Sequence, residues 1–186
     1  DVAYAFGVDF ASSYSTFGDM KKLNLEVYKK AVQHGLHEEQ LQIDPRQAND
    51  FMVKYKSEMG KEVGAAFLAA NKTKPGVITT ASGLQYKVIR KGTGPKPTSP
   101  NDQVTVHYKG MLTDGKVFDS SYDRGETTSF GLNQVIRGWT EGLQLMEVGS
   151  KYEFYIPENL AYGPQTQGGI PPYSTLVFEV ELFKIN

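Results

Sequence analysis

The sequence predicts an α+β protein in which an all-helical N-terminal domain precedes an antiparallel β-sheet wrapped around one short helix. Three observations support this prediction. Apolar residues recur at helical spacing through about residue 72, and from Ile78 onward they alternate with polar residues. Within that alternating half, only the segment from Thr140 to Met146 has a helical pattern. Helices and strands that are segregated along a chain are typical of the α+β class.

The helical half begins with two short amphipathic patterns. Their apolar residues recur every three or four positions, which places them on one face of each helix: Phe6, Phe10, Tyr14 and Phe17, then Leu25, Tyr28, Val32 and Leu36. We therefore expect two helices here, each with a broad apolar face.

A third and much longer helix has the clearest start signal. Asp44 can cap it, Pro45 suits the first helical position, and Gln47 lies where a capping box requires an acceptor. Gly60 and Gly64 weaken the helix by up to ~1 kcal/mol each. It should end before the Lys-Pro-Gly run that follows, because proline cannot continue the hydrogen-bond ladder. Its apolar stripe comprises Ala48, Met52, Tyr55, Met59, Val63, Phe67 and Ala70.

These helices are expected to form a dimerisation domain over residues 1–74, followed by a second domain over residues 75–186. Three helices with broad apolar faces have little partner surface within one chain, so an intertwined homodimer would bury those faces better. The long third helix would then connect the dimer body to the second domain. The alternative is a small helical domain with a core of its own.

The second half alternates apolar and polar residues in four segments, as half-buried antiparallel strands do. The residues of the expected core face are Leu84, Tyr86 and Val88; Val104, Val106 and Tyr108; Tyr152, Phe154 and Ile156; and Leu176, Phe178, Val180 and Leu182. His107 alternates with Tyr108 and is expected on the opposite face. Thr113-Asp114-Gly115-Lys116 predicts a hairpin turn, because Asp-Gly accepts positive φ.

Composition limits the possible functions. The formal net charge is −1, so no strong field attracts nucleic acid or an anionic membrane. No apolar run approaches the ~20 residues that span a bilayer. The chain has no cysteine, and His34 and His37 lack a third ligand, so we expect neither a metal site nor a cysteine nucleophile. Because the chain begins at Asp1, we expect a processed or a trimmed chain, which is compatible with a secreted or lipid-anchored origin.

Three segments of the second domain indicate a small-ligand pocket. The only tryptophan, Trp139, follows a polar turn and an apolar run, Tyr162 borders a glycine-rich loop, and Phe118 precedes Asp119. Aromatic walls with one or two fixed hydrogen-bonding groups are the usual makeup of such a site. Taken singly, each residue also has an ordinary explanation, since a tryptophan can fill a core and an aspartate can cap a turn.

Four segments occur in a fixed order between Thr79 and Asn186: VHYKGMLTDGKVFDSS, VIRGWTEGL, IPENLAYG and GIPPYSTLVFEVELFKI. In sequence and spacing they resemble the FKBP-type peptidyl-prolyl isomerases. The helical half followed by SGLQYKV resembles the bacterial macrophage-infectivity-potentiator subgroup, in which an N-terminal helical domain forms a dimer. The resemblance implies a cofactor-free enzyme that acts on Xaa–Pro bonds of unfolded or partly folded polypeptides.

The resemblance also implies roles for individual residues. Trp139 would be the platform under the proline ring, the backbone N–H of Ile136 would hold one ligand carbonyl, and the Tyr162 hydroxyl would bind another. Asp119 would lie near the twisting amide, steadied by Arg124. The remaining wall and rim residues that the resemblance implies are Tyr108, Phe118, Phe130, Gln134, Val135, Ile170 and Phe178.

The sequence departs from the single-domain family pattern in three places. Thr128 falls where an aromatic residue often adds a wall, Gln134 stands where an acidic residue is common, and the polar loop of residues 164–169 is shorter. These departures imply a more open pocket with altered affinity for the macrocyclic inhibitors of the family.

The leading hypothesis is a homodimeric prolyl isomerase of a bacterial envelope, either periplasmic or associated with the outer membrane. A cytoplasmic location is the alternative. Two other functions stay open at this point: a dimeric chaperone in which isomerisation is secondary, and an inert scaffold that uses the fold as an interaction surface.

Overall fold

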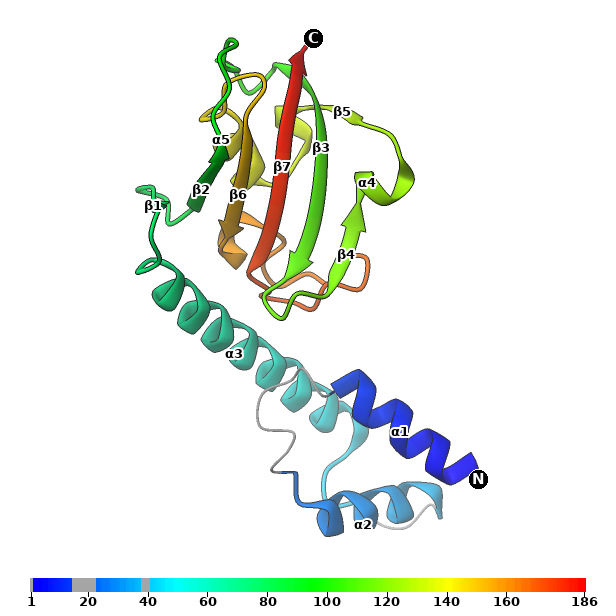
Figure 1. Ribbon diagram of the computed structural model, residues 1–186. Coiled ribbons are helices and arrows are strands. Elements are labelled where there is room, and N and C mark those ends of the chain that lie inside the picture. Colours follow the sequence, from blue (N-terminus) through cyan, green and yellow to red (C-terminus); the bar gives the residue numbers. More distant parts are fainter. Residues whose placement is uncertain (1, 15–22, 38–40) are drawn as a thin grey trace. The chain divides into compact units, whose positions relative to one another are not determined.

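A computed structural model describes residues 2–14, 23–37 and 41–186, and it confirms the α+β class (Figure 1). The chain divides into two compact units, residues 1–59 and 60–186. The helices of the N-terminal half are α1 (Val2–Tyr14), α2 (Leu25–Leu36) and α3 (Pro45–Asn71). The last turns of α3, from Gly60 onward, belong to the second unit, so this division falls before the boundary at residue 74 that the sequence suggests.

Side-chain caps define where the helices begin. Asp44 Oδ1 accepts hydrogen bonds from two backbone N–H groups at 2.8 and 3.0 Å, while Gln47 Oε1 accepts one from the Asp44 N–H at 3.3 Å. This reciprocal pair is the capping box that the sequence predicts for α3. Asn24 caps α2 through its Oδ1 in the same way. Phe17, the last residue of the first predicted apolar face, lies outside the described residues.

The second unit is built on a seven-stranded antiparallel sheet with the order β1-β2-β6-β7-β3-β4, in which β5 also pairs with β3 (Figure 1). The strands are β1 (Val77–Thr79), β2 (Gln85–Arg90), β3 (Gln103–Leu112), β4 (Val117–Ser120), β5 (Thr128–Gly131), β6 (Lys151–Ile156) and β7 (Leu176–Ile185). The four predicted alternating segments correspond to β2, β3, β6 and β7. In β2 the expected faces are wrong in part, because Val88 is exposed whereas Gln85 is buried by its hydrogen bonds to α3. The short strands β1, β4 and β5 lack a clear sequence signal, since three or four residues show little alternation.

The predicted hairpin turn connects β3 to β4. Gly115 has a φ of 88°, and its N–H donates to the carbonyl of Leu112 at 3.0 Å. This left-handed conformation is one that glycine adopts without steric cost, which explains the Asp-Gly pair.

Helix α5 (Arg137–Leu143) packs on the sheet and carries Trp139. A β-carbon at Gly138 would lie 2.4 Å from Ile156 Cγ2, and one at Gly142 would lie 2.7 Å from Phe154 Cε1. The two glycines therefore allow the helix backbone to approach β6 closely. The helix begins three residues before the predicted Thr140, because its first turn forms directly after Ile136, whose carbonyl accepts the N–H of Trp139 at 2.9 Å.

Short elements complete the second unit. They are α4 (Ser121–Arg124), η2 (Leu132–Gln134) and η3 (Glu158–Leu160). The hydrophobic core between α5 and the sheet includes Phe154, Leu143, Met146 and Val180, all fully buried. Trp139 belongs to this core and is 4% exposed, so close packing holds its side chain in place.

Candidate active site

A cavity of about 450 Å³ lies above Trp139 and is open on one side. Its lining comes from β3, β4, β5, β7, η2, α5 and the loop after η3, so residues distant in sequence meet here. This volume suits a small-ligand site. The lining residues are Tyr108, Phe118, Asp119, Phe130, Gln134, Val135, Ile136, Trp139, Tyr162, Gln167 and Phe178.

The aromatic floor and walls hold one another in place. The indole of Trp139 meets Tyr108 and Phe178 edge-on, with ring centroids 5.3 and 5.1 Å apart and interplanar angles of 85° and 83°. Phe130 lies 5.1 Å from the indole, and Phe118 meets Phe178 edge-on at 5.5 Å. Edge-to-face pairs are favoured over face-to-face stacks, so these rings form a rigid apolar box.

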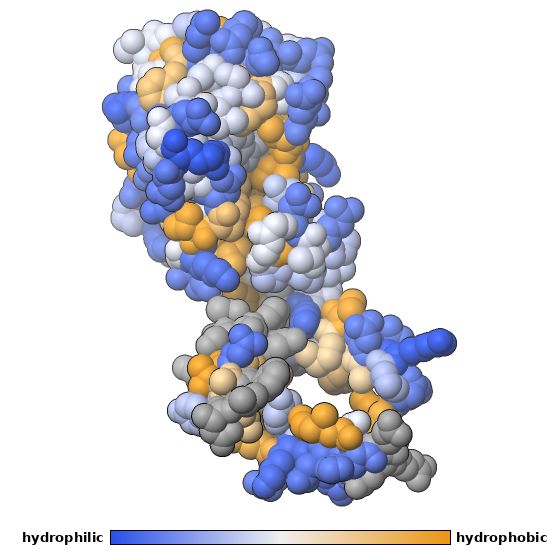
Figure 2. Space-filling view, turned by 90° about the vertical axis from the view of Figure 1, so that its right-hand side faces the viewer, coloured by the Kyte–Doolittle hydropathy of each residue, from blue (hydrophilic) through white to orange (hydrophobic). Residues whose placement is uncertain are grey.

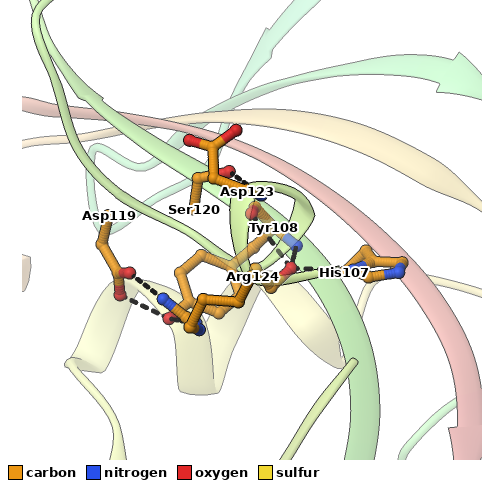
Figure 3. A network of polar contacts seen from close by, with 7 residues as sticks. His107, Tyr108, Asp119, Ser120, Asp123 and Arg124 are labelled. Carbon is orange, nitrogen blue, oxygen red and sulfur yellow. Dashed lines mark hydrogen bonds and ion pairs between the residues drawn. The ribbon is translucent and has the colours of Figure 1, made fainter. Parts of the chain in front are cut away.

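One rim of the cavity is polar. The Tyr108 hydroxyl donates to Asp119 Oδ2, and Arg124 Nη1 forms an ion pair with Asp119 Oδ1 (Figure 3). Arg124 Nη2 also donates to the Tyr108 hydroxyl oxygen at 3.0 Å. The carboxylate is thus fixed from two sides, although Asp119 and Arg124 both stay partly exposed.

The short helix α4 positions Arg124 for this contact. Ser120 caps it by accepting the Asp123 N–H at 3.1 Å, and Gly125 ends it with a φ of 72°. Ser121 anchors the helix to β3, since its Oγ accepts the N–H of Tyr108 at 2.8 Å. His107 Nδ1 lies 2.8 Å from the same Oγ on the side away from the cavity, as the strand alternation predicts.

Asp119 and Tyr162 each have a single protonation state near neutral pH. Burial raises the pKa of Asp119, but hydrogen bonds from Tyr108 and Arg124 outweigh that effect and hold the pKa below its ordinary value of 3.8. Burial raises the pKa of Tyr162, and the negative charge of Asp119 raises it further. The cavity therefore has an ionised carboxylate and a protonated phenol.

Several hydrogen-bond donors of the lining residues lack protein acceptors among the described residues, and one of them is the buried Nε1 of Trp139. Among the described residues, no group accepts a hydrogen bond from the Tyr162 hydroxyl or from the backbone N–H of Ile136. Buried and half-buried donors in proteins are normally paired, so an unpaired donor at a cavity marks a place where a ligand acceptor fits.

The structure brings together ten of the twelve residues that the sequence singled out. The ten that line the cavity are Asp119, Tyr162, Ile136, Trp139, Phe118, Tyr108, Phe130, Gln134, Val135 and Phe178. Arg124 does not line it but contacts two residues that do. Ile170 is not among the lining residues; it is 3% exposed and belongs to the hydrophobic core. Thr128 is likewise absent from the lining.

Gln167 lines the cavity but has no distinguishing sequence signal. It belongs to the polar loop after Tyr162, where it pairs with Ile170 through two backbone hydrogen bonds of 2.7 and 3.2 Å. A glutamine in a polar loop is typical of solvent-facing positions, so only the tertiary fold could place it at the cavity. Among the described residues, no group of three or more acidic or histidine side chains could hold a metal ion.

Comparisons with known proteins define the class. The family model for FKBP-type peptidyl-prolyl cis-trans isomerases matches residues 94–183, and the model for the domain amino-terminal to such isomerases matches residues 1–88. The chain is 41% identical to "Outer membrane protein MIP" of Legionella longbeachae, over the whole chain and 84% of that relative. It therefore belongs to the FKBP-type peptidyl-prolyl cis-trans isomerases and is an enzyme of that type.

Two further proteins are similar to nearly the whole chain. The chain is 43% identical to "Probable FKBP-type peptidyl-prolyl cis-trans isomerase FkpA" of Neisseria meningitidis serogroup B, over 99% of the chain and 73% of that relative. The crystal structure of FkpA from Escherichia coli matches with a TM-score of 0.66 and 34% identity, covering all of this chain and 95% of that one. These matches favour isomerisation over the chaperone alternative, and they confirm the resemblance to the Mip-like subgroup.

Proposed function

We propose that the cavity above Trp139 binds the prolyl ring of an Xaa–Pro segment and that the residues around it stabilise the twisted amide. The observation that supports this most is the combination of a rigid apolar box with two unpaired donors, the Tyr162 hydroxyl and the Ile136 N–H, and one fixed carboxylate, Asp119. A proline ring is apolar and suits the aromatic walls, and the carbonyl groups beside it can accept hydrogen bonds from the two donors. One site therefore offers both kinds of contact.

The chemistry explains why such a site suffices. Rotation about an Xaa–Pro amide is slow because the bond has partial double-bond character, with a barrier of about 18–20 kcal/mol. No covalent bond is broken, so the rotation itself requires no nucleophile. Any group that binds the twisted amide more tightly than the planar amide lowers the barrier.

The apolar box contributes by removing water from the amide carbonyl. Water stabilises the charge-separated planar form, and that form is lost when the amide twists, so rings such as Trp139 and Phe178 favour the twisted state. The two donors hold the carbonyls on either side and so define the axis of rotation. Asp119 lies at the rim near the twisting bond, where Tyr108 and Arg124 restrict its movement.

A substitution tests the role of the rim. Asp119→Ala should lower kcat/KM for a proline-containing tetrapeptide by about tenfold or more, since fixed charges at reaction centres have effects of at least this size. Asp123→Ala is the matched control, because Asp123 lies on neighbouring α4 but does not line the cavity. NMR exchange spectroscopy measures the cis–trans rate directly. If both variants keep the parental rate, the assignment of Asp119 is wrong.

The natural substrates are proposed to be proline-containing unfolded or partly folded polypeptides, since the cavity is open on one side and can receive a chain segment. Macrocyclic inhibitors of the family should compete for the same cavity. The open rim, with Gln134 and without an aromatic ring at Thr128, supports an affinity that differs from that of single-domain members.

We also propose that the helical unit forms a homodimer. Many of its apolar side chains are exposed in the single chain, and Figure 2 shows apolar surface over this unit. The exposed residues include Tyr4, Val8, Leu25, Val27, Leu36, Ile43, Phe51 and Val53. Sedimentation of the full chain against a fragment that starts near Gly60, where the second unit begins, tests this, with a dimer and a monomer expected respectively. A monomeric full chain would contradict the proposal.

A location in a bacterial cell envelope is proposed on the similarity to a relative named as an outer membrane protein. No helix among the described residues is long and apolar enough to cross a membrane. Immunoblotting of fractionated cells that express the natural gene tests the location, and recovery in the cytoplasmic fraction alone would contradict it.

A further inference from the structure

The loop of residues 161–175, called the pocket loop here, carries two of the residues that line the cavity, Tyr162 and Gln167. Its two limbs are tied together at the base, where the Tyr173 N–H donates to the carbonyl of Gly163 at 2.6 Å. Gly163 directly follows Tyr162. A displacement of the second limb at Tyr173 is therefore transmitted to the residue beside the cavity phenol.

The second limb of the pocket loop lies against the last turns of α3, within the same compact unit. A β-carbon at Gly60 would lie 2.9 Å from the carbonyl oxygen of Pro172 and 3.2 Å from Tyr173 Cβ. A β-carbon at Gly64 would lie 2.4 Å from Thr175 Oγ1. Residues four apart share one helix face, so the two glycines form a single bare surface on which the loop rests.

Further contacts fix this end of α3 on the second unit. Asn71 Nδ2 donates to Gln85 Oε1 at 3.0 Å, and Gln85 Nε2 donates to the Leu68 carbonyl at 2.9 Å; Asn71 and Gln85 are both buried. The Phe67 ring lies 6.0 Å from that of Tyr155 on β6. Buried side-chain hydrogen bonds of this kind specify one geometry, so the helix end is a fixed support for the loop, although Asn71 Oδ1 has no partner among the described residues.

The two glycines are unfavourable for the helix itself. Glycine is less favourable than alanine in a helix interior, because it loses more backbone freedom on folding. The loop also contains an unfavourable conformation, since Tyr173 has a φ of 57° although it is not glycine. Lys61 Nζ lies 4.3 Å from the centroid of the Tyr173 ring, over its face. Helix and loop thus each adopt a costly feature at the place where they touch.

We propose that Gly60 and Gly64 are positioning residues for isomerisation: by admitting the pocket loop to the surface of α3, they set where the Tyr162 hydroxyl lies in the cavity. Neither glycine touches the substrate. The inference rests on the proposed role of Tyr162, but the position of the loop can be measured without reference to that role. The contact between the two glycines and the loop thus connects the last turns of α3 to the catalytic cavity.

The test uses the full chain and measures kcat/KM by NMR exchange with a proline-containing tetrapeptide. In Gly64→Ala the Thr175 Oγ1 must move, since the new β-carbon would lie 2.4 Å from it. The proposal predicts that the loop moves with it, so kcat/KM should fall by about tenfold, as displacements near 1 Å can cost tenfold or more. Thr175→Ala removes the atom that the new methyl group meets. The pair Gly64→Ala with Thr175→Ala should therefore recover the rate of the Thr175→Ala protein within about twofold.

Two further variants separate a positioning role from general destabilisation. Gly60→Ala should also slow turnover, but Thr175→Ala should not rescue it, because its methyl group meets the Pro172 carbonyl oxygen rather than Thr175. Gly35→Ala on α2 is the control, since no atom of the described residues lies within 4 Å of the position of its β-carbon. It should keep the parental rate. All rates are compared at a temperature where circular dichroism shows every variant to be folded.

Backbone amide shifts of Gln167, Gly168 and Gly169 report the loop position independently of turnover. They should move in Gly64→Ala and return in the double variant. A folded Gly64→Ala protein with parental rate and shifts, or a double variant that stays as slow as Gly64→Ala, overturns the proposal. If Gly64→Ala does not fold, parental rate and shifts in Gly60→Ala overturn it instead. If the amide shifts move in Gly64→Ala but Tyr162→Phe keeps full activity, only the proposed role of Tyr162 is contradicted.

Discussion

The hydroxyl of Tyr162 offers the sharpest test of the site, because it can be removed without disturbing the packing. Tyr162→Phe keeps the ring that packs against the core and deletes only the oxygen. No described residue accepts a hydrogen bond from that oxygen in the free protein. The free energy of unfolding should therefore change by less than about 0.5 kcal/mol, the usual range for substitutions that remove no native contact.

The effect on catalysis follows from the hydrogen bond that the phenol would make to a substrate carbonyl. A neutral hydrogen bond contributes about 0.5–1.5 kcal/mol net, which corresponds to about a 2- to 13-fold loss in kcat/KM if the bond is made in the transition state. The raised pKa of Tyr162 means that the donor stays protonated through neutral pH, so the loss should not vary between pH 6 and pH 8.

The assay is NMR exchange or protease-coupled isomerisation of a proline-containing tetrapeptide, with urea unfolding run in parallel. Tyr152→Phe is the matched control: Tyr152 lies in the core on β6 and does not line the cavity. It should leave kcat/KM unchanged. A folded Tyr162→Phe protein with parental kcat/KM would refute the reasoning, and so would an equal loss in Tyr152→Phe.

Two further predictions concern charge and packing. Hydrogen bonds from Tyr108 and Arg124 outweigh burial and lower the pKa of Asp119, so kcat/KM should stay constant as pH falls toward 3.8. Arg124→Leu removes one of these hydrogen bonds and should move the acid limb of the pH–rate profile to higher pH. Because the pKa of Asp119 is lowered in the folded state, the ionised carboxylate stabilises the fold above its unfolded pKa, and this contribution is lost as pH falls through the folded pKa. An acid limb that does not move in Arg124→Leu would contradict the role of Arg124 in lowering the pKa of Asp119. Phe154→Ala should lower the free energy of unfolding by about 3–5 kcal/mol in urea titrations, since Phe154 is fully buried. A loss below about 1 kcal/mol would show that the core closes around the gap.

Much of the second unit could be predicted from the sequence because its long strands are buried on one face. Alternation around Tyr108 follows directly from the two-residue period of a strand. It is less regular on β6 and β7, where Tyr155 and Val177 are buried as well as Phe154 and Phe178. The capping box at Asp44 and the turn at Gly115 were equally predictable, since both depend on local hydrogen bonds and φ values. The cavity residues were identified through a family resemblance, as their separation in sequence contains no geometric information.

The features that could not be predicted depend on tertiary contacts. Ile170 and Gln167 lie three residues apart in one polar loop, yet the first is in the core and the second lines the cavity. That choice depends on how the pocket loop folds back on itself. Likewise, Gly60 and Gly64 weaken a helix when considered locally, and only their contact with residues 172–175 gives them another explanation.

The most direct test of the central claim uses the chain's only tryptophan. Intermolecular NOE spectra of the protein with a proline-containing tetrapeptide should show cross-peaks between the prolyl ring protons and the indole protons of Trp139. They should disappear when a macrocyclic FKBP inhibitor is added. Cross-peaks from the prolyl ring to a different surface, with none to Trp139 at saturating peptide, would contradict the claim that this cavity is where the amide turns.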